Sequence, residues 1–296
     1  MSGRTILTPP FAVYFLRLLL AALTILLLPP GAAAQANQAP VRFLLTFDDG
    51  PAWAPYFNPT VRILETLEKN AYQDNLKAVF FTQTRAWSGG GTERGRALIR
   101  REHAEGHVVA LHSATTFHSN HRLMSREKLD QTLQLGVADL VAETGVAPKL
   151  VRPPFWAYDA DTLASYRAHG LHMLLTDLSA KDGVVYVFNM SFHKRSNMLK
   201  MLAETRKRWA AGAMPVVDGV TPVVVTFHDV NSYTARHFEE YLGILLDVAR
   251  ELEIPLADKP FYDNRDELER AAMASSVDTP ENAPPLPGLW HWLWQQ

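Results

Sequence analysis

Short apolar runs alternate along this chain with longer stretches in which apolar residues recur at helical spacing. The short runs are rich in Val, Leu and Phe, which favours buried strands. They are Phe43–Phe47, Ala78–Phe81, Val108–Leu111, Lys149–Val151, Met173–Thr176 and Val223–Phe227. Amphipathic helices are predicted over Pro59–Lys69, Glu93–Glu105, Ser125–Glu143, Asp159–His169, Lys194–Ala211 and Ala235–Glu253. This alternation predicts an α/β fold built on a parallel sheet or barrel.

Ionisable residues stand directly after five of the predicted strands. They are Asp48-Asp49, His112, Arg152, Asp177 and His228-Asp229. A single polar residue after a strand is usually a turn former or a helix cap. In a parallel barrel, however, all strands end at one rim, and catalytic groups collect there. Five such strand ends therefore predict one shared active site.

The N-terminus has the composition of a secretory signal peptide. Arg4 and Arg17 supply positive charge, Leu18–Leu28 is apolar, and Gly31–Ala34 offers small residues for cleavage. We expect residues 1–34 to be removed, with an uncleaved anchor as the alternative. The mature protein would then be exported to a bacterial periplasm or secreted, without strong membrane association.

Two segments remain after the predicted signal peptide. Residues 35–274 are expected to form a single catalytic domain, because α/β barrels routinely use about that length. Residues 275–296 form a Pro-rich and Trp-rich C-terminal tail, which contains Trp290, Trp292 and Trp294. Packing of this tail onto the domain is favoured over stacking on sugar or contact with a membrane.

Composition limits the chemistry that the shared site can use. The chain has no cysteine, so any metal must be held by histidines and carboxylates. Such a metal polarises a carbonyl and makes water more acidic, and the reaction also needs a base and an acid. Asp48 and Asp49 can divide metal binding and base catalysis, and His228 can serve as the acid. The formal net charge of −2 gives no indication of a nucleic acid partner.

Five motifs occur in an order that resembles the polysaccharide deacetylase family, also called carbohydrate esterase family four. They are Thr46–Gly50, the pair His112-Ser113 with a further histidine downstream, Arg152–Phe155, an Asp-containing segment, and a strand ending in His228-Asp229. The resemblance covers about residues 41–232. It implies a distorted parallel (β/α) barrel that removes N-acetyl or O-acetyl groups from a carbohydrate polymer or oligomer.

The resemblance also implies a role for each matching residue. Asp48 matches a general base, and Arg152 matches the residue that holds the base. Asp49 and His112 match metal ligands, and His228 matches a general acid. The implied divalent metal is zinc, with cobalt, nickel or iron as alternatives.

The third metal ligand departs from the family pattern. The second histidine usually stands four residues after the first, but position 116 is Thr. Counting back from Ser125, which opens the following predicted helix, favours His118 and a two-residue insertion. His121 is the alternative, because a loop has no fixed period that would exclude it.

The fourth motif lacks its usual Trp, and two aspartates compete for one role. Either Asp177 or Asp182 could hydrogen-bond His228 and raise its pKa, which keeps the acid protonated near neutral pH. Asp182 is favoured, because the pairing Asp in the family immediately precedes the Trp position. Helix or turn capping is then expected for Asp177.

The acetyl-binding pocket is also altered in this sequence. The backbone N–H of Phe155 matches an oxyanion contact in the family. The position two before His228 is Thr226, where Leu is common. Trp156 or Phe227 could refill the space that the missing Trp and Leu leave, or either ring could pack in the barrel.

The sequence thus predicts a metal-dependent polysaccharide deacetylase with a carbohydrate substrate. A metal-dependent amidohydrolase that cleaves a non-sugar C–N bond is the second hypothesis. A catalytically impaired carbohydrate-binding relative is the third, although binding alone would not require the complete set of catalytic residue types.

Overall fold

The chain is described from a computed structural model in which residues 38–182, 193–279 and 283 are placed. The predicted signal peptide, residues 1–34, lies outside the described residues, as do the three tryptophans of the tail. Within the described part of the chain, no helix combines the length and apolarity needed to cross a membrane. The fold below concerns the body that begins at Ala39.

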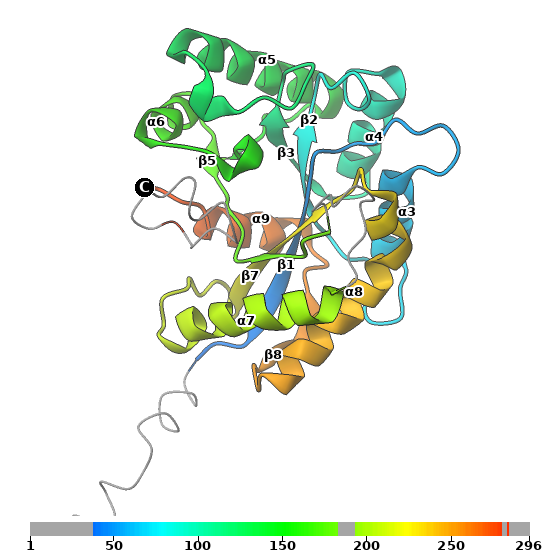
Figure 1. Cartoon of the computed structure of the whole chain (residues 1–296), viewed down its shortest axis with the longest axis vertical. Coiled ribbons are helices and arrows are strands. Elements are labelled where there is room, and N and C mark those ends of the chain that lie inside the picture. The colour runs from blue at the N-terminus through cyan, green and yellow to red at the C-terminus, as the bar shows by residue number, and fades with distance from the viewer. Residues whose placement is uncertain (1–37, 183–192, 280–282, 284–296) are drawn as a thin grey trace, which may run out of the picture. The chain divides into compact units, whose positions relative to one another are not determined.

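A curled sheet of parallel strands forms the centre of this body (Figure 1). The strands are β1 (Val41–Asp48), β2 (Val79–Gln83), β3 (Val108–Ser113), β4 (Leu150–Val151), β5 (His172–Met173), β6 (Leu178–Ser179), β7 (Thr221–His228) and β8 (Leu256–Phe261). Their order is β5-β4-β3-β2-β1-β7-β6, and β8 also pairs with β1. Because β5 and β6 end this order without pairing with each other, the sheet is an open, distorted (β/α) barrel.

Helices surround the sheet (Figure 1). They are α3 (Pro59–Glu68), α4 (Glu93–Ala104), α5 (Arg126–Thr144), α6 (Ala160–Ala168), α7 (Lys194–Ala210), α8 (Ser232–Glu251) and α9 (Arg265–Ala274), with short 3₁₀ turns at His121–Leu123 and Pro154–Trp156. Phe43, Leu45 and Phe47 of β1 belong to a core cluster with residues of α3 and α8. The intervening Leu44 belongs to another cluster with residues of α9. Both faces of the central strand are therefore covered, as expected for a parallel sheet.

Several helices begin at a polar side chain that caps their first free N–H groups. Asn58 accepts a hydrogen bond at the start of α3, Thr92 at α4, Ser125 at α5 and Asp159 at α6. Such caps stabilise a helix by about 1 kcal/mol each.

The six predicted strands and six predicted helices are all present, with shifts of a few residues at their ends. The prediction missed β6, β8 and α9. β6 has only two residues, and β8 is half-exposed along most of its length, so neither gives a clear apolar run. Val277, beyond the predicted domain boundary at 274, donates a backbone hydrogen bond to Met173 O of β5 at 2.7 Å.

Candidate metal and catalytic site

The carboxyl ends of the parallel strands bring the predicted chemistry together. The register between β1 and β7 places Asp48 opposite His228, and that between β3 and β4 places Leu111 opposite Val151. His112 and Arg152, each one residue further on, therefore lie side by side. Parallel pairing thus converts positions 180 residues apart in the sequence into neighbours.

Three donor atoms converge beside this strand edge. His112 Nε2 lies 3.2 Å from Asp49 Oδ1, and His118 Nε2 lies 3.4 Å from the same oxygen. The two Nε2 atoms are 3.2 Å apart. All three donor atoms lie within 4.8 Å of one another. Two imidazole nitrogens and one carboxylate oxygen this close together are suitable ligands for one divalent cation, and they would leave further coordination positions free for water or substrate.

The tautomer of His112 supports a ligand role. Its Nδ1 lies 2.8 Å from the carbonyl oxygen of Arg152, which can only accept a hydrogen bond. Nδ1 therefore carries a proton, and Nε2 is the ring nitrogen that faces the donor cluster and can bind a cation. Fixing of one ring nitrogen by a carbonyl is the usual outer support of a metal-binding histidine. The donor set thus fits a cation.

Burial and neighbouring charges set the pKa values of Asp49 and His118, two of the three residues of the donor set. Burial alone would raise the pKa of Asp49, but the hydrogen bond from His112 and the neighbouring histidines lower it well below its usual value. Burial is the main cause that lowers the pKa of His118 to about 4, assisted by repulsion from His112. An ionised Asp49 and a neutral His118 are forms that bind a metal.

His121, the alternative third ligand, points elsewhere. Its Nδ1 hydrogen-bonds the Tyr166 hydroxyl at 2.8 Å, and the residue is only 1% exposed. His118 instead stacks on the ring of Phe155, with centroids 4.3 Å apart. The structure therefore places His118, and not His121, beside Asp49 and His112.

Asp48 lies in a buried ion pair. Arg152 Nη1 donates to Asp48 Oδ1 at 2.7 Å and to Thr46 Oγ1 at 2.7 Å. The other guanidinium nitrogens donate to the carbonyls of Leu174 and Leu175 at the end of β5, at 2.9 and 3.1 Å. Arg152 is fully buried, so its many partners are needed to offset desolvation. The result is a carboxylate held in one orientation.

His228 pairs with Asp182. Asp182 Oδ1 lies 2.9 Å from His228 Nδ1, and Asp182 Oδ2 accepts from the His228 backbone N–H at 2.8 Å. Burial opposes the charged ring, but the charge and hydrogen bond of Asp182, with Asp49 and Asp48, raise the pKa of His228 to about 10. His228 Nε2 lies 4.0 Å from Asp49 Oδ2, so the proton on this nitrogen faces the donor set.

Asp177, the alternative partner of His228, lies away from the site. Its carboxylate accepts from Arg208 Nη1 at 2.7 Å and from the backbone N–H of Val224 at 2.9 Å. These bonds connect α7 to the edge of β7. Asp177 thus links α7 to the sheet. Only four of the five predicted strand ends contribute to the site.

The residues expected in the acetyl pocket lie in different environments. Phe155 and Trp156 both have positive φ, 61° and 54°, in the turn after β4. The Phe155 ring contacts His118, whereas Trp156 is 9% exposed and belongs to a core cluster with Leu163 and Tyr166. Phe227 is fully buried among the aromatic residues under α8. Whether Trp156 contacts substrate stays a prediction.

Sequence reasoning gave no role to three polar residues that support the site. Gln83 Nε2 donates to Asp49 Oδ1 at 3.0 Å. Thr46 accepts from Arg152, and its hydroxyl lies 3.1 Å from that of Thr226, which is fully buried. Thr46 and Thr226 are polar residues inside apolar strands, and Gln83 ends a strand. That signal was present in the sequence.

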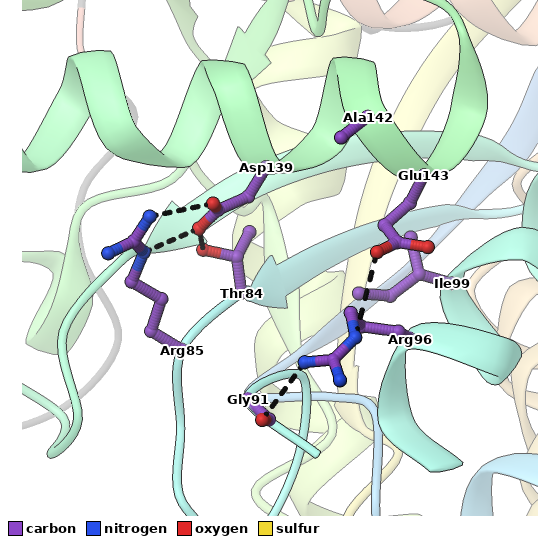
Figure 2. A pocket seen from close by; sticks show the side chains of 8 residues that line it. All are labelled: Thr84, Arg85, Gly91, Arg96, Ile99, Asp139, Ala142 and Glu143. Atoms are coloured by element: carbon purple, nitrogen blue, oxygen red, sulfur yellow. Dashed lines mark hydrogen bonds and ion pairs between the residues drawn. The ribbon is translucent and has the colours of Figure 1, made fainter. Parts of the chain in front are cut away.

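A second cavity, of about 320 Å³, lies between the loop after β2, the first half of α4 and the last turns of α5. Figure 2 shows that its charged side chains face one another. Arg85 forms two hydrogen bonds with Asp139, at 2.7 and 2.8 Å, and Arg96 pairs with Glu143. Because these charges already have partners, the cavity offers no converging reactive groups.

The fold and the site together define an α/β barrel with a candidate cation site flanked by a carboxylate and a histidine. Residues 36–174 match the family model of polysaccharide deacetylases, so this stretch of the chain is similar to that family. The match includes Asp48, Asp49, His112, His118 and Arg152, and it ends before Asp182 and His228.

Individual relatives agree with this assignment. A chitin deacetylase of Colletotrichum lindemuthianum is 30% identical over 154 residues, which are 52% of this chain and 58% of the relative. A peptidoglycan-N-acetylglucosamine deacetylase of Bacillus cereus is 36% identical over 115 residues, 38% of this chain and 35% of the relative. The chain thus spans between a third and three fifths of these two relatives.

The fold has a counterpart among solved structures. The chitin deacetylase structure from Colletotrichum lindemuthianum superposes with a TM-score of 0.54, over 75% of this chain and 86% of that chain, at 23% identity. At this identity the likeness concerns the fold alone.

Proposed function

We propose that this protein is a metal-dependent carbohydrate deacetylase that hydrolyses N-acetyl groups on an N-acetylglucosamine polymer or oligomer. The observation that carries the proposal is the placement of a fixed carboxylate, Asp48, and a protonated histidine, His228, around one three-donor cation site. The names of the two relatives, which refer to chitin and to peptidoglycan N-acetylglucosamine, support the choice of substrate.

The cation would be held by Asp49, His112 and His118, with zinc as the first choice and cobalt or nickel as alternatives. When bound, it would polarise the acetyl carbonyl and make a water molecule easier to deprotonate. No other ionisable cluster in the described residues brings three such donors together.

The protein's own groups would then move two protons. Asp48 accepts a proton from the attacking water, and its ion pair with Arg152 keeps the carboxylate in place. His228 donates its Nε2 proton to the departing amine as the C–N bond breaks. Acetate and a free amine are the products. The backbone N–H of Phe155 would donate a hydrogen bond to the carbonyl oxygen as negative charge develops there.

Replacement of Asp48 by Asn tests this assignment. The variant should keep its cation but release acetate from N-acetylglucosamine oligomers at least about 10²-fold more slowly, because the base is lost. Asp139→Asn is the matched control, since it also removes an arginine-paired carboxylate, but one in the second cavity. Full turnover by Asp48→Asn would show that the mechanism is wrong.

Two other activities have distinct outcomes in the same assay. Release of acetate from acetylated xylan, but not from N-acetylglucosamine oligomers, would indicate an O-acetyl esterase. Hydrolysis of a small non-sugar amide with no acetate released from any carbohydrate would indicate an amidohydrolase.

Export to the periplasm or the cell surface is part of the proposal. It rests on the charged, apolar and small-residue segments of residues 1–34. N-terminal sequencing of the exported protein should give a start near Gln35. A start at Met1 would contradict cleavage.

A further inference from the structure

Asp49, the carboxylate of the proposed cation site, has a backbone conformation that needs support from its surroundings. Its φ is 72°, in the left-handed region that residues other than glycine seldom adopt. Such a conformation costs free energy and persists where neighbouring contacts hold it. The Asp49 side chain is 23% exposed, so protein groups make up most of its environment. The contacts around Asp49 therefore decide where its carboxylate points.

Gln83, the last residue of β2, contacts the turn formed by Asp49 and Gly50 at two points. Its backbone N–H donates to Gly50 O at 2.9 Å, and its side-chain Nε2 donates to Asp49 Oδ1 at 3.0 Å. Gln83 is 6% exposed, so this amide lies in the protein interior. Because an ionised carboxylate can only accept, the NH₂ end of the amide faces Asp49. The two contacts tie both the turn and the carboxylate to β2.

The pairing of β2 with β3 places this contact beside a histidine of the donor set. Thr82 lies opposite Leu111. The next residue, Gln83, lies opposite Ser113, so β3 contains one extra residue, His112. Irregularities of this kind redirect side chains near active sites. At this point of the sheet, Gln83 Nε2 and His112 Nε2 reach the same carboxylate oxygen, at 3.0 and 3.2 Å.

Gln83 differs from the other groups around this oxygen because it is not a proposed ligand. The Nε2 atoms of His112 and His118 lie 3.2 and 3.4 Å from Asp49 Oδ1. A ring nitrogen that binds a cation has no hydrogen to donate to Asp49. The oxygen itself has two lone pairs, so it can accept from Gln83 and still bind a cation. Within the described part of the chain, Gln83 is the one side chain outside the donor set that hydrogen-bonds this carboxylate.

The charge of the holding group separates the two neighbouring aspartates. Asp48 is held by the guanidinium of Arg152 at 2.7 Å, and that positive charge would oppose a cation at the Asp48 carboxylate. Asp49 is held by the uncharged amide of Gln83 at 3.0 Å, which leaves the negative charge of Asp49 available. The two contacts thus fit a cation ligand at Asp49 and not at Asp48.

We propose that Gln83 is a positioning residue of the cation site. Its hydrogen bond turns Asp49 Oδ1 toward the Nε2 atoms of His112 and His118, so that the three donor atoms converge before a cation binds. Outer hydrogen bonds of this kind change metal affinity by roughly 10–100-fold. The inference rests on the cation site of the proposed function and deepens it, because it names a residue that sets the affinity of that site.

Gln83→Leu tests the proposal, because it removes the amide and leaves a side chain of similar size. Zinc affinity is measured by competition with a chelator of known zinc affinity. The variant should bind zinc at least about 10-fold more weakly than the parent, since Asp49 is no longer held in its binding orientation. Gln83→Asn keeps an amide on a side chain that is one methylene shorter. It should lose zinc affinity in the same way, because its amide does not reach Asp49 Oδ1.

Gln73→Leu is the matched control. Gln73 Nε2 donates to Phe261 O at 3.0 Å, the same distance as in the Gln83 contact, but Gln73 lies between α3 and β2, before the strand begins. Its replacement should lower thermal stability and keep the zinc affinity of the parent. Thermal unfolding of the chelator-treated proteins shows that each variant is folded.

The cobalt-loaded protein gives a second readout that does not depend on activity. The visible absorption of bound cobalt depends on the arrangement of its ligands. Gln83→Leu should therefore change the cobalt spectrum, whereas Gln73→Leu should keep the spectrum of the parent.

A zinc affinity and a cobalt spectrum like those of the parent in folded Gln83→Leu would overturn the inference. An equal loss of zinc affinity in Gln73→Leu would also overturn it, because the effect would then follow from lower stability alone. Failure of the proposed function looks different. In that case the parent would bind zinc but would release no acetate from N-acetylglucosamine oligomers.

Discussion

Asp182→Asn removes the carboxylate that holds His228 in its charged form. In the structure Asp182 accepts from the His228 backbone N–H at 2.8 Å, from His228 Nδ1 at 2.9 Å and from the Thr234 hydroxyl at 2.7 Å. An Asn oxygen can keep the bonds to the backbone N–H and the hydroxyl, but its NH₂ group then faces Nδ1. The ring must accept at Nδ1, which favours neutral His228.

The size of the effect follows from the pKa of His228. A rise from the ordinary 6.5 to about 10 corresponds to about 5 kcal/mol of preference for the charged ring, at about 1.4 kcal/mol per pKa unit. The charge and hydrogen bond of Asp182 contribute most to the raised pKa of His228, and the charges of Asp49 and Asp48 supply the rest. Asp182→Asn should therefore lower the pKa of His228 most of the way back toward 6.5, and reduce kcat by about 10²-fold at neutral pH.

The upward direction of the pKa shift of His228 also predicts how protein stability depends on pH. Because the folded-state pKa is raised, the pair stabilises the fold fully below about pH 6.5, and this stabilisation is lost as pH rises through about 10. The parent and Asp182→Asn should thus differ most in free energy of unfolding at neutral or lower pH, and least above pH 10. Denaturant unfolding of chelator-treated protein measures the difference.

Two assays measure the protonation of the His228 ring directly. NMR titration of the His228 ring in chelator-treated protein should show a much lower pKa in the variant than in the parent. The alkaline limb of the kcat/KM profile should move to lower pH in the same direction. If the ring pKa and the alkaline limb both stayed where the parent has them, Asp182 would not be the group that tunes the acid.

Four further substitutions test other parts of the site. His118→Ala should abolish stoichiometric zinc binding, whereas His121→Ala should keep it and only lower thermal stability; equal retention of zinc in both would refute the ligand assignment. Gly50→Ala places a Cβ 2.2 Å from both carboxylate oxygens of the buried Asp229, and should destabilise the protein by about 1–3 kcal/mol in denaturant unfolding, a cost that a neutral result would contradict. Arg152→Ala leaves a buried carboxylate without its partner and should cost about 3–5 kcal/mol, measured in the same way; a loss below about 1 kcal/mol would show that the ion pair is not needed.

Much of the fold was predictable because the spacing of apolar residues within a short segment indicates a strand or a helix. The run Phe43–Phe47 is apolar throughout, and a strand buried on both faces requires that pattern. By contrast β8 is half-exposed and contains Lys259 and Pro260, so it resembles a loop in sequence. It becomes a strand because it pairs with Val41 and Phe43 at the start of β1, which lie outside the stretch of β1 that pairs with β2.

Some residues of the candidate site were also predictable from the sequence, and others were not. Asp48 and Asp49 are adjacent in the chain, so the end of one strand delivers both to the rim in fixed relative positions. The choice between His118 and His121, and that between Asp177 and Asp182, depended on loops. A loop has no period, and the side chain that reaches the site is selected by contacts with residues far along the chain.

The sequence by itself therefore determined the strand ends, the residue types that stand there and the exclusion of thiolate ligands. Tertiary structure decided which histidine and which aspartate join them, because those positions depend on strand register and loop packing. It also gathered three exposed aromatic residues from separate loops, Trp53, Trp87 and Phe117, around a cavity of about 420 Å³ whose wall includes Asp49 and His118. No sequence period connects three separate loops, and only the parallel sheet brings their starting points to a common edge.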